Sequence, residues 1–195
     1  MKRNLIPTVV ICLIIMSISL SLFVNKVVTP KNMTTEDYKE LGVYLKDPPR
    51  TLDGFKLVDT HKSPFLPQDF SGSWNVVFFG FTYCPDICPI TMHQLGKVET
   101  RFQEKEIKKI KFYFVTVDPD RDSIDIIKKY LSNFSENFVG LTGTLDQIYK
   151  FSTQVNSPFD PVSNSQDSSY SVTHSGNIVL INPEGLFAGL FKAPH

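Results

Sequence analysis

The chain has 195 residues, of which 42% are hydrophobic and 21% charged, a composition typical of a folded globular protein and not of a disordered one. Lysine plus arginine and aspartate plus glutamate each number 20, and this zero formal net charge argues against a nucleic-acid-binding protein that neutralises phosphates. Three cysteines are too few for a small disulfide framework, but they suffice for one reactive pair. The length suits one sizeable domain.

Residues 5–24, LIPTVVICLIIMSISLSLFV, carry no charge. As a helix they would span roughly 30 Å, the thickness of a bilayer core. Lys2 and Arg3 precede the run, which predicts a cytoplasmic N-terminus and an exported remainder in the periplasm. We therefore expect residues 1–24 to be an uncleaved, single-pass anchor in the cytoplasmic (inner) membrane, with Cys12 as an apolar filler in the lipid.

Two other kinds of targeting segment compete with the anchor. A cleaved signal peptide would need a pair of small residues at its cleavage site, and the stretch 20–28 offers only Ser21. A lipoprotein signal would need small residues just before its cysteine, whereas Cys12 follows Val-Val-Ile. The sequence favours the uncleaved anchor over both.

Residues 25–50 contain Pro30, Pro48 and Pro49 and many polar side chains, so we expect a tether with only a short helix near residues 36–44. Residues 51–195 should fold as one domain, in which short apolar segments alternate with stretches of helical periodicity. We expect strands at 55–58 and 63–66 (a small hairpin), 76–81, 110–117, 178–181 and 186–190, and helices at 87–102, 122–134 and 144–153. Asp122 is the expected N-cap of the second helix, 182–185 a hairpin turn, and 163–171 a surface loop. This order predicts an α/β layer fold of the thioredoxin-like type with peroxiredoxin-like insertions.

The sharpest chemical feature is a pair of cysteines, Cys84 and Cys88, where a buried strand turns into a helix. Positions four apart share one helix face, so the two sulfurs could form a disulfide or bind one soft metal ion. The positive end of the helix dipole should stabilise a thiolate, which attacks disulfides and binds metals. A plain structural disulfide is the simplest alternative in an exported protein, and zinc is disfavoured because a second ligand pair is missing.

A third ligand has to come from another part of the chain. His174 lies directly before the strand at 178–181, in a loop that faces the cysteine pair in a thioredoxin-like fold. His61 and His93 are expected to be solvated and His195 is the last residue, while Met92 extends the cysteine stripe but suits core packing better. Two thiolates and one imidazole match the soft ion Cu(I).

These residues carry a resemblance to a known family. The chain resembles the Sco/SenC family of membrane-anchored, thioredoxin-like copper-binding proteins over about residues 40–195. The matching motifs, in family order, are FGFTYCPDICP (79–89), VTVDPDRD (115–122), GLTGT (140–144) and VTHS (172–175).

The resemblance implies Cu(I) held by Cys84, Cys88 and His174. It also implies a role in assembling the copper centre of cytochrome c oxidase, by copper delivery to its copper-accepting subunit, by reduction of that subunit's cysteines, or by both. Other copper carriers or thiol reductases are further partners of this kind. Thr173 stands where many relatives have aspartate, and the sequence ends at His195 where relatives usually continue into a helix. Asp118 ends a buried strand, where it either lies near the site or caps the following turn.

Three functions follow from these residues. The first is a copper-binding assembly factor. The second is a thiol-disulfide oxidoreductase in which Cys84 attacks a partner disulfide and Cys88 resolves it, but enzymes of this fold usually have C-x-x-C and a proline before the later strand. The third is a thiol peroxidase, which would need a supporting arginine, and the sequence places none near Cys84. The copper-binding factor fits best.

Overall fold

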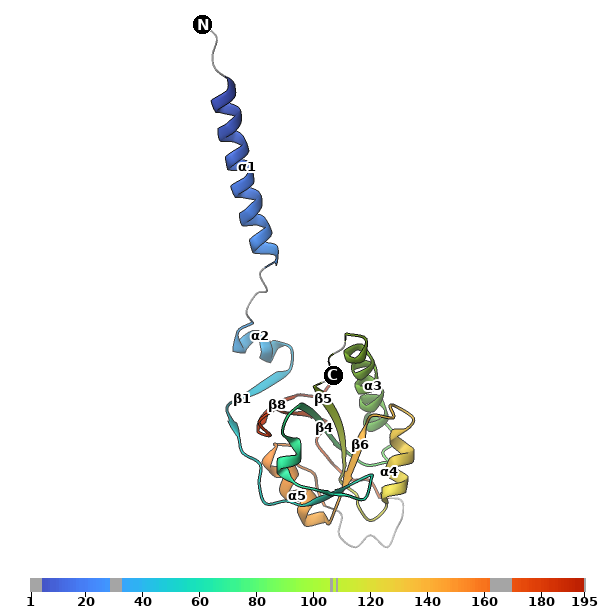
Figure 1. Ribbon diagram of the computed structural model, residues 1–195. Helices are drawn as coiled ribbons and strands as arrows, with labels where there is room; N and C mark the ends of the chain where they lie inside the picture. Colours follow the sequence, from blue (N-terminus) through green and yellow to red (C-terminus); the bar gives the residue numbers. More distant parts are fainter. Residues whose placement is uncertain (1–4, 29–32, 106, 108, 162–169, 195) are drawn as a thin grey trace. The chain divides into compact units, whose positions relative to one another are not determined.

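The computed structural model describes residues 5–28, 33–105, 107, 109–161 and 170–194. The chain divides into two units, Met1–Glu36 and Asp37–His195, which are described separately. The first contains helix α1 (Leu5–Val28), seen in Figure 1. Its segment Pro7–Lys26 is long and apolar enough to cross a membrane, and none of it is buried within the protein. Membrane anchors and signal sequences share this character.

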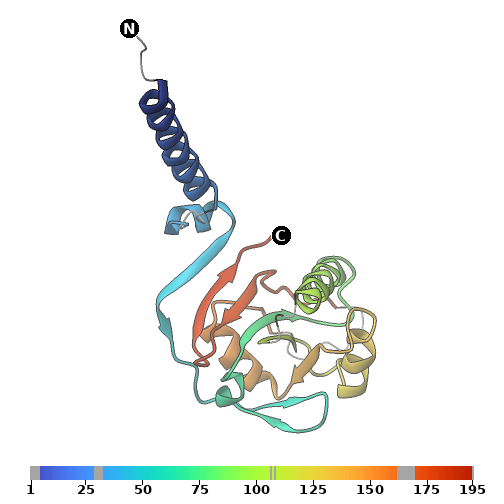
Figure 2. The same ribbon diagram turned by 45° about the horizontal axis from the view of Figure 1, so that its top comes forward.

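The second unit is built on an eight-stranded mixed sheet (Figures 1 and 2). The strands are β1 (Val43–Arg50), β2 (Leu57–Asp59), β3 (Pro64–Phe65), β4 (Trp74–Gly80), β5 (Ile110–Thr116), β6 (Val139–Thr142), β7 (Ile178–Ile181) and β8 (Phe187–Phe191). Their order across the sheet is β1-β8-β7-β4-β5-β6-β2-β3. The neighbours β4, β5 and β6 run parallel, and the other pairs are antiparallel.

Helices cover both faces of this sheet. They are α3 (Ile87–Glu104), α4 (Ile124–Leu131), α5 (Leu145–Gln154) and the 3₁₀ turn η1 (Pro67–Phe70), while the short α2 (Thr35–Glu40) precedes β1. Successive side chains of β4 point to opposite faces. Phe78 packs with residues of α3 and α4, whereas Val77 and Phe79 pack with residues of α5 and η1. The two cores confirm the predicted α/β layers.

Strand β1 lies in the segment that we expected to be a tether. Val43–Arg50 pairs antiparallel with β8 although it contains Pro48 and Pro49. The prolines are tolerated because β1 is at the edge of the sheet, where one side of the strand needs no ladder hydrogen bonds. The sheet therefore begins before the domain boundary that we expected at residue 51.

Four further elements test the sequence patterns. The hairpin β2–β3 and the hairpin β7–β8 form as predicted, the latter around the turn closed by Gly185 N–H and the Asn182 carbonyl (2.9 Å). Strand β6 was not predicted, because it has four residues and includes a glycine. Helix α4 begins later than expected, and its N-cap is Ser123, whose Oγ accepts from Ile126 N–H (3.3 Å). Residues 163–169 of the predicted surface loop lie outside the described residues.

Candidate metal centre

Both cysteines lie where strand β4 ends and helix α3 begins. Cys84 is in the connecting loop, where its backbone N–H donates to the Phe81 carbonyl (3.2 Å) and its side chain is partly exposed. Cys88 is in the first turn of α3, and its side chain is completely buried. Both are free thiols. The pair therefore offers two sulfurs that differ in their access to solvent.

Burial decides the protonation of Cys88. The helix dipole was expected to favour a thiolate, but burial raises the pKa of the Cys88 thiol above its usual range, and the hydrogen bond with Cys84 raises it further. Cys88 is therefore a protonated thiol at neutral pH. A soft metal ion that binds this sulfur has to displace the proton.

His174 faces the cysteine pair from the segment before β7. Its Nε2 lies 3.4 Å from Cys88 Sγ. Its Nδ1 lies 3.0 Å from the Ser175 carbonyl oxygen, which can only accept, so Nδ1 carries the hydrogen and Nε2 presents a lone pair. Burial lowers the pKa of His174, which keeps the ring in the neutral form that binds metals.

The three side chains converge on one point. The ligand atoms of Cys84, Cys88 and His174 all lie within 4.8 Å of one another, and they form the one such group of potential metal ligands found among the described residues. Two thiols and one imidazole are a donor set for a soft ion, with no carboxylate in it. The residues fit a copper ion in kind and in number.

Small and aromatic residues shape the space around these ligands. The rings of Phe78 and Phe81 meet the His174 imidazole edge-on, at centroid distances of 6.1 and 5.8 Å. Gly80 ends β4 beneath Cys88, and a Cβ at this position would lie only 2.9 Å from Cys88 Sγ. The absence of a side chain at Gly80 therefore makes room for the buried sulfur.

Two other histidines lie outside this group of ligands. His61 and His93 are exposed, as expected for solvated histidines. Met92 is 1% exposed and packs in the same core cluster as Cys88, which is the packing role that the sequence favoured for it. His195 lies outside the described residues.

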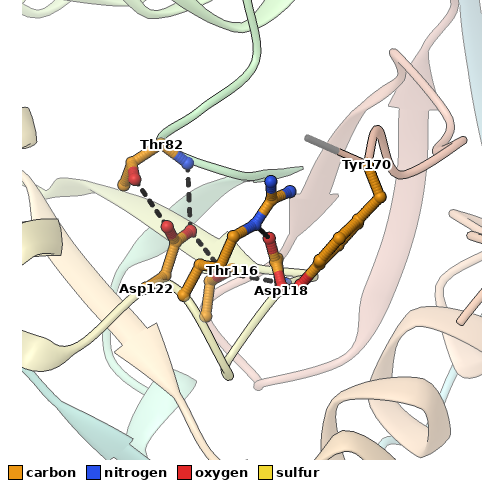
Figure 3. Close-up of polar contacts among 6 residues, drawn as sticks. Thr82, Thr116, Asp118, Asp122 and Tyr170 are labelled. Atoms are coloured by element: carbon orange, nitrogen blue, oxygen red, sulfur yellow. Dashed lines mark hydrogen bonds and ion pairs between the residues drawn. The ribbon is translucent and has the colours of Figure 1, made fainter. Parts of the chain in front are cut away.

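Asp122 has a different position from the one that the sequence suggested. It is 1% exposed, and instead of capping a helix it accepts three hydrogen bonds in the network of Figure 3. The donors are Thr82 N–H (3.0 Å), Thr82 Oγ1 (2.5 Å) and Thr116 Oγ1 (2.6 Å). Burial raises the pKa of Asp122, and these hydrogen bonds oppose the rise. Asp122 thereby ties the loop that carries Cys84 to the end of β5.

Asp118 joins a second set of contacts beside the first. Its carboxylate pairs with Arg121 Nε (2.5 Å). It also accepts from the Tyr170 hydroxyl (2.6 Å), as Figure 3 shows. Arg121 was missed by sequence reasoning as a neighbour of the site, although its guanidinium carbon lies 5.2 Å from the ring centroid of Tyr83. Arg121 and Thr82 both contact carboxylates, those of Asp118 and Asp122.

The fold and the cluster define a thioredoxin-like domain with a Cys-Cys-His metal-site candidate, and comparisons with known proteins agree. The model of the SCO1/SenC family matches residues 45–195. The chain therefore belongs to the SCO1/SenC family. It is 35% identical over 155 residues to a protein of Stutzerimonas stutzeri whose name assigns it copper binding, with 80% of this chain and 76% of that protein covered.

Eukaryotic relatives and solved structures show the same kinship. The chain is 35% identical over 138 residues to the mitochondrial SCO2 homologue of Mus musculus, covering 70% of this chain and 54% of that one. It thus spans about half the length of that relative. Yeast Sco1 with copper bound is 33% identical with a TM-score of 0.68, covering 74% and 81% of the two chains. Bradyrhizobium japonicum ScoI with copper bound is 30% identical with a TM-score of 0.65, covering 74% and 91%. These likenesses confirm the thioredoxin-like fold.

Proposed function

We propose that this chain is a membrane-anchored Cu(I)-binding assembly factor that holds its cargo ion with Cys84, Cys88 and His174. The observation that carries the proposal is the convergence of these three ligand atoms within 4.8 Å. Two relatives of known structure contain copper, which supports the choice of metal. Thiolate sulfur and a neutral imidazole favour the cuprous state.

The acceptor in this proposal is the copper centre of cytochrome c oxidase. The chain either delivers copper to the copper-accepting subunit or reduces that subunit's cysteines before the metal arrives. The resemblance to the Sco/SenC family supports this role. With α1 as an uncleaved anchor, the domain Asp37–His195 works in the periplasm, beside an acceptor in the same membrane.

The decisive experiment is an anaerobic Cu(I) titration of the reduced full-length protein in detergent. The wild-type protein should bind one ion, and a variant with Cys84→Ser and Cys88→Ser should bind none. Cys12→Ser is the matched control, because Cys12 is also a free thiol but lies in α1. His174→Ala should weaken binding without abolishing it, since two sulfurs remain. Unchanged stoichiometry in the double variant would refute the ligand assignment.

A membrane-anchored thiol-disulfide oxidoreductase is the second candidate. The partly exposed Cys84 and the buried Cys88 have the order of access that an attacking and a resolving cysteine need. His174→Ala separates the two functions in cells that contain only this variant. Loss of copper from the oxidase supports the copper carrier, whereas normal oxidase copper together with unchanged Cu(I) affinity supports the thiol enzyme.

A further inference from the structure

The loop of Cys84 and the segment of His174 are far apart in the sequence, yet one arginine lies against both. The Arg121 guanidinium carbon lies 3.6 Å from the ring centroid of Tyr170 and 5.2 Å from that of Tyr83. Tyr83 directly precedes Cys84, and Tyr170 belongs to the segment that leads to His174. A guanidinium is attracted to aromatic faces at such distances.

Asp118 fixes this arginine from the turn that follows strand β5. Its carboxylate pairs with Arg121 Nε at 2.5 Å. It also accepts from the Tyr170 hydroxyl at 2.6 Å (Figure 3). Asp118 is 4% exposed and Arg121 15%, so the pair is shielded from solvent. Charge-assisted hydrogen bonds of this kind are short and directional. Tyr170 is therefore held twice, through its ring and through its hydroxyl.

The segment between Tyr170 and His174 is extended, so the position of Tyr170 affects the position of His174. Val172 is 4% exposed and packs in the core, whereas Ser171 and Thr173 are exposed, which is the alternation of an extended chain. In such a chain Tyr170 and His174 lie on the same side as Val172. The segment is also held by a backbone contact, because the Thr173 carbonyl oxygen accepts a hydrogen bond from Asp160 N–H (2.8 Å).

We propose that Tyr170, through its stack on Arg121 and its hydrogen bond to Asp118, is a positioning residue that sets the approach of His174 to the cysteine pair. This inference rests on the proposed function of the same three ligands. Tyr170 is not itself one of the three ligands. Tyr170 is held by Asp118 and Arg121, and Arg121 also lies against Tyr83 in the Cys84 loop. The segment that runs from Tyr170 to His174 is thereby fixed relative to this loop, so the imidazole meets the sulfurs at a set distance.

A double-mutant cycle of Tyr170 and His174 tests the proposal. Cu(I) affinity is measured by chelator competition for the full-length wild type, Tyr170→Ala, His174→Ala and the double variant. A residue that acts only through His174 has no effect once the imidazole is gone. We expect Tyr170→Ala to weaken Cu(I) binding about three- to tenfold in the wild-type background and by less than about twofold in the His174→Ala background.

Two further variants control for folding and for the chemistry of the contact. Tyr44→Ala removes another tyrosine that meets a cation, since Lys192 Nζ lies 6.0 Å from its ring centroid, and it should leave copper affinity unchanged. Tyr170→Phe keeps the ring on Arg121 but loses the hydroxyl, so its loss should be smaller than that of alanine. It also carries the same cycle if the alanine variant fails to fold.

The outcomes separate this inference from the proposed function. An equal loss for Tyr170→Ala in both backgrounds, or no loss in the wild-type background, would overturn the positioning role and leave the three ligands standing. A wild-type protein that binds no Cu(I), or a His174→Ala variant with unchanged affinity, would overturn the proposed function and the positioning role with it.

Discussion

Replacing Gly80 with alanine should disturb the metal centre through a single methyl group. The added Cβ would lie 2.9 Å from Cys88 Sγ. This distance is about 0.5 Å shorter than 3.4 Å, the lower limit of an ordinary van der Waals contact. On its other sides it would meet Phe114 Cε2 and Phe78 Cε1, both at 3.1 Å. Both rings are completely buried, so neither can swing into solvent. The contact with Cys88 Sγ is the shortest of the three, so we expect the strain to be relieved mainly by a shift of this sulfur relative to β4.

Two magnitudes follow from this geometry. Inserting a methyl group into a packed core costs about 1–3 kcal/mol of stability. Metal ligands have to be held within about 0.5 Å of their working positions, so a comparable displacement of Cys88 Sγ should lower Cu(I) affinity by at least about tenfold, equivalent to ~1.4 kcal/mol.

Chelator competition under anaerobic conditions measures the affinity, and urea unfolding measures the stability. Gly143→Ala is the matched control, because its Cβ would meet Leu57 Cδ2 at 3.1 Å, in a part of the domain that supplies no proposed ligand. This control should keep the copper affinity of the wild type. If Gly80→Ala bound Cu(I) as tightly as the wild type at unchanged stability, the close contact between Gly80 and Cys88 would have no bearing on the site.

Three other outcomes are expected. Because burial raises the pKa of Asp122 above its ordinary 3.8, the native protein keeps a proton that the unfolded chain has released, so stability should fall as the pH rises upward from about 3.8. Urea unfolding at a series of pH values should show that this fall is missing in Asp122→Asn. If the unfolding free energy changed equally with pH in the wild type and in the variant, Asp122 would not be its cause. Oxidising Cys84 and Cys88 to a disulfide should abolish Cu(I) binding, because the metal and the disulfide compete for the same two sulfurs. A titration of the oxidised protein that still reached one ion per chain would refute this. Mass spectrometry of the membrane-extracted protein should find residues 1–24 attached, whereas a mature N-terminus near residue 25 would refute the anchor.

The elements predicted correctly are those whose information is local. Most of strand β4 lies in the apolar run 76–81, and the turn 182–185 between β7 and β8 has the composition of a tight turn. Cys84 and Cys88 could be placed at a strand–helix junction for the same reason. His174 needed one more step, because only the expected fold brings its segment to the cysteines, and the structure does bring the three side chains together.

The elements that were missed depend on neighbours that the local sequence does not reveal. Strand β1 looked like a tether because of Pro48 and Pro49, and only its place at the edge of the sheet beside β8 makes the prolines acceptable. Strand β6 is too short to show a period of its own. It exists because β5 and β2 flank it on both sides.

Asp122 and Arg121 show why the surroundings of the site were harder to predict than its ligands. An aspartate at the expected start of a helix suggests an N-cap in any sequence, because the local pattern is the same whether its carboxylate faces solvent or the core. Here Ser123 caps the helix, and Asp122 instead binds Thr82 on another loop. Ligand chemistry restricts a residue to a few types that can be recognised anywhere in a chain, but a residue that positions a ligand is defined by what it touches. Such residues therefore become visible only when the contacts between loops are known.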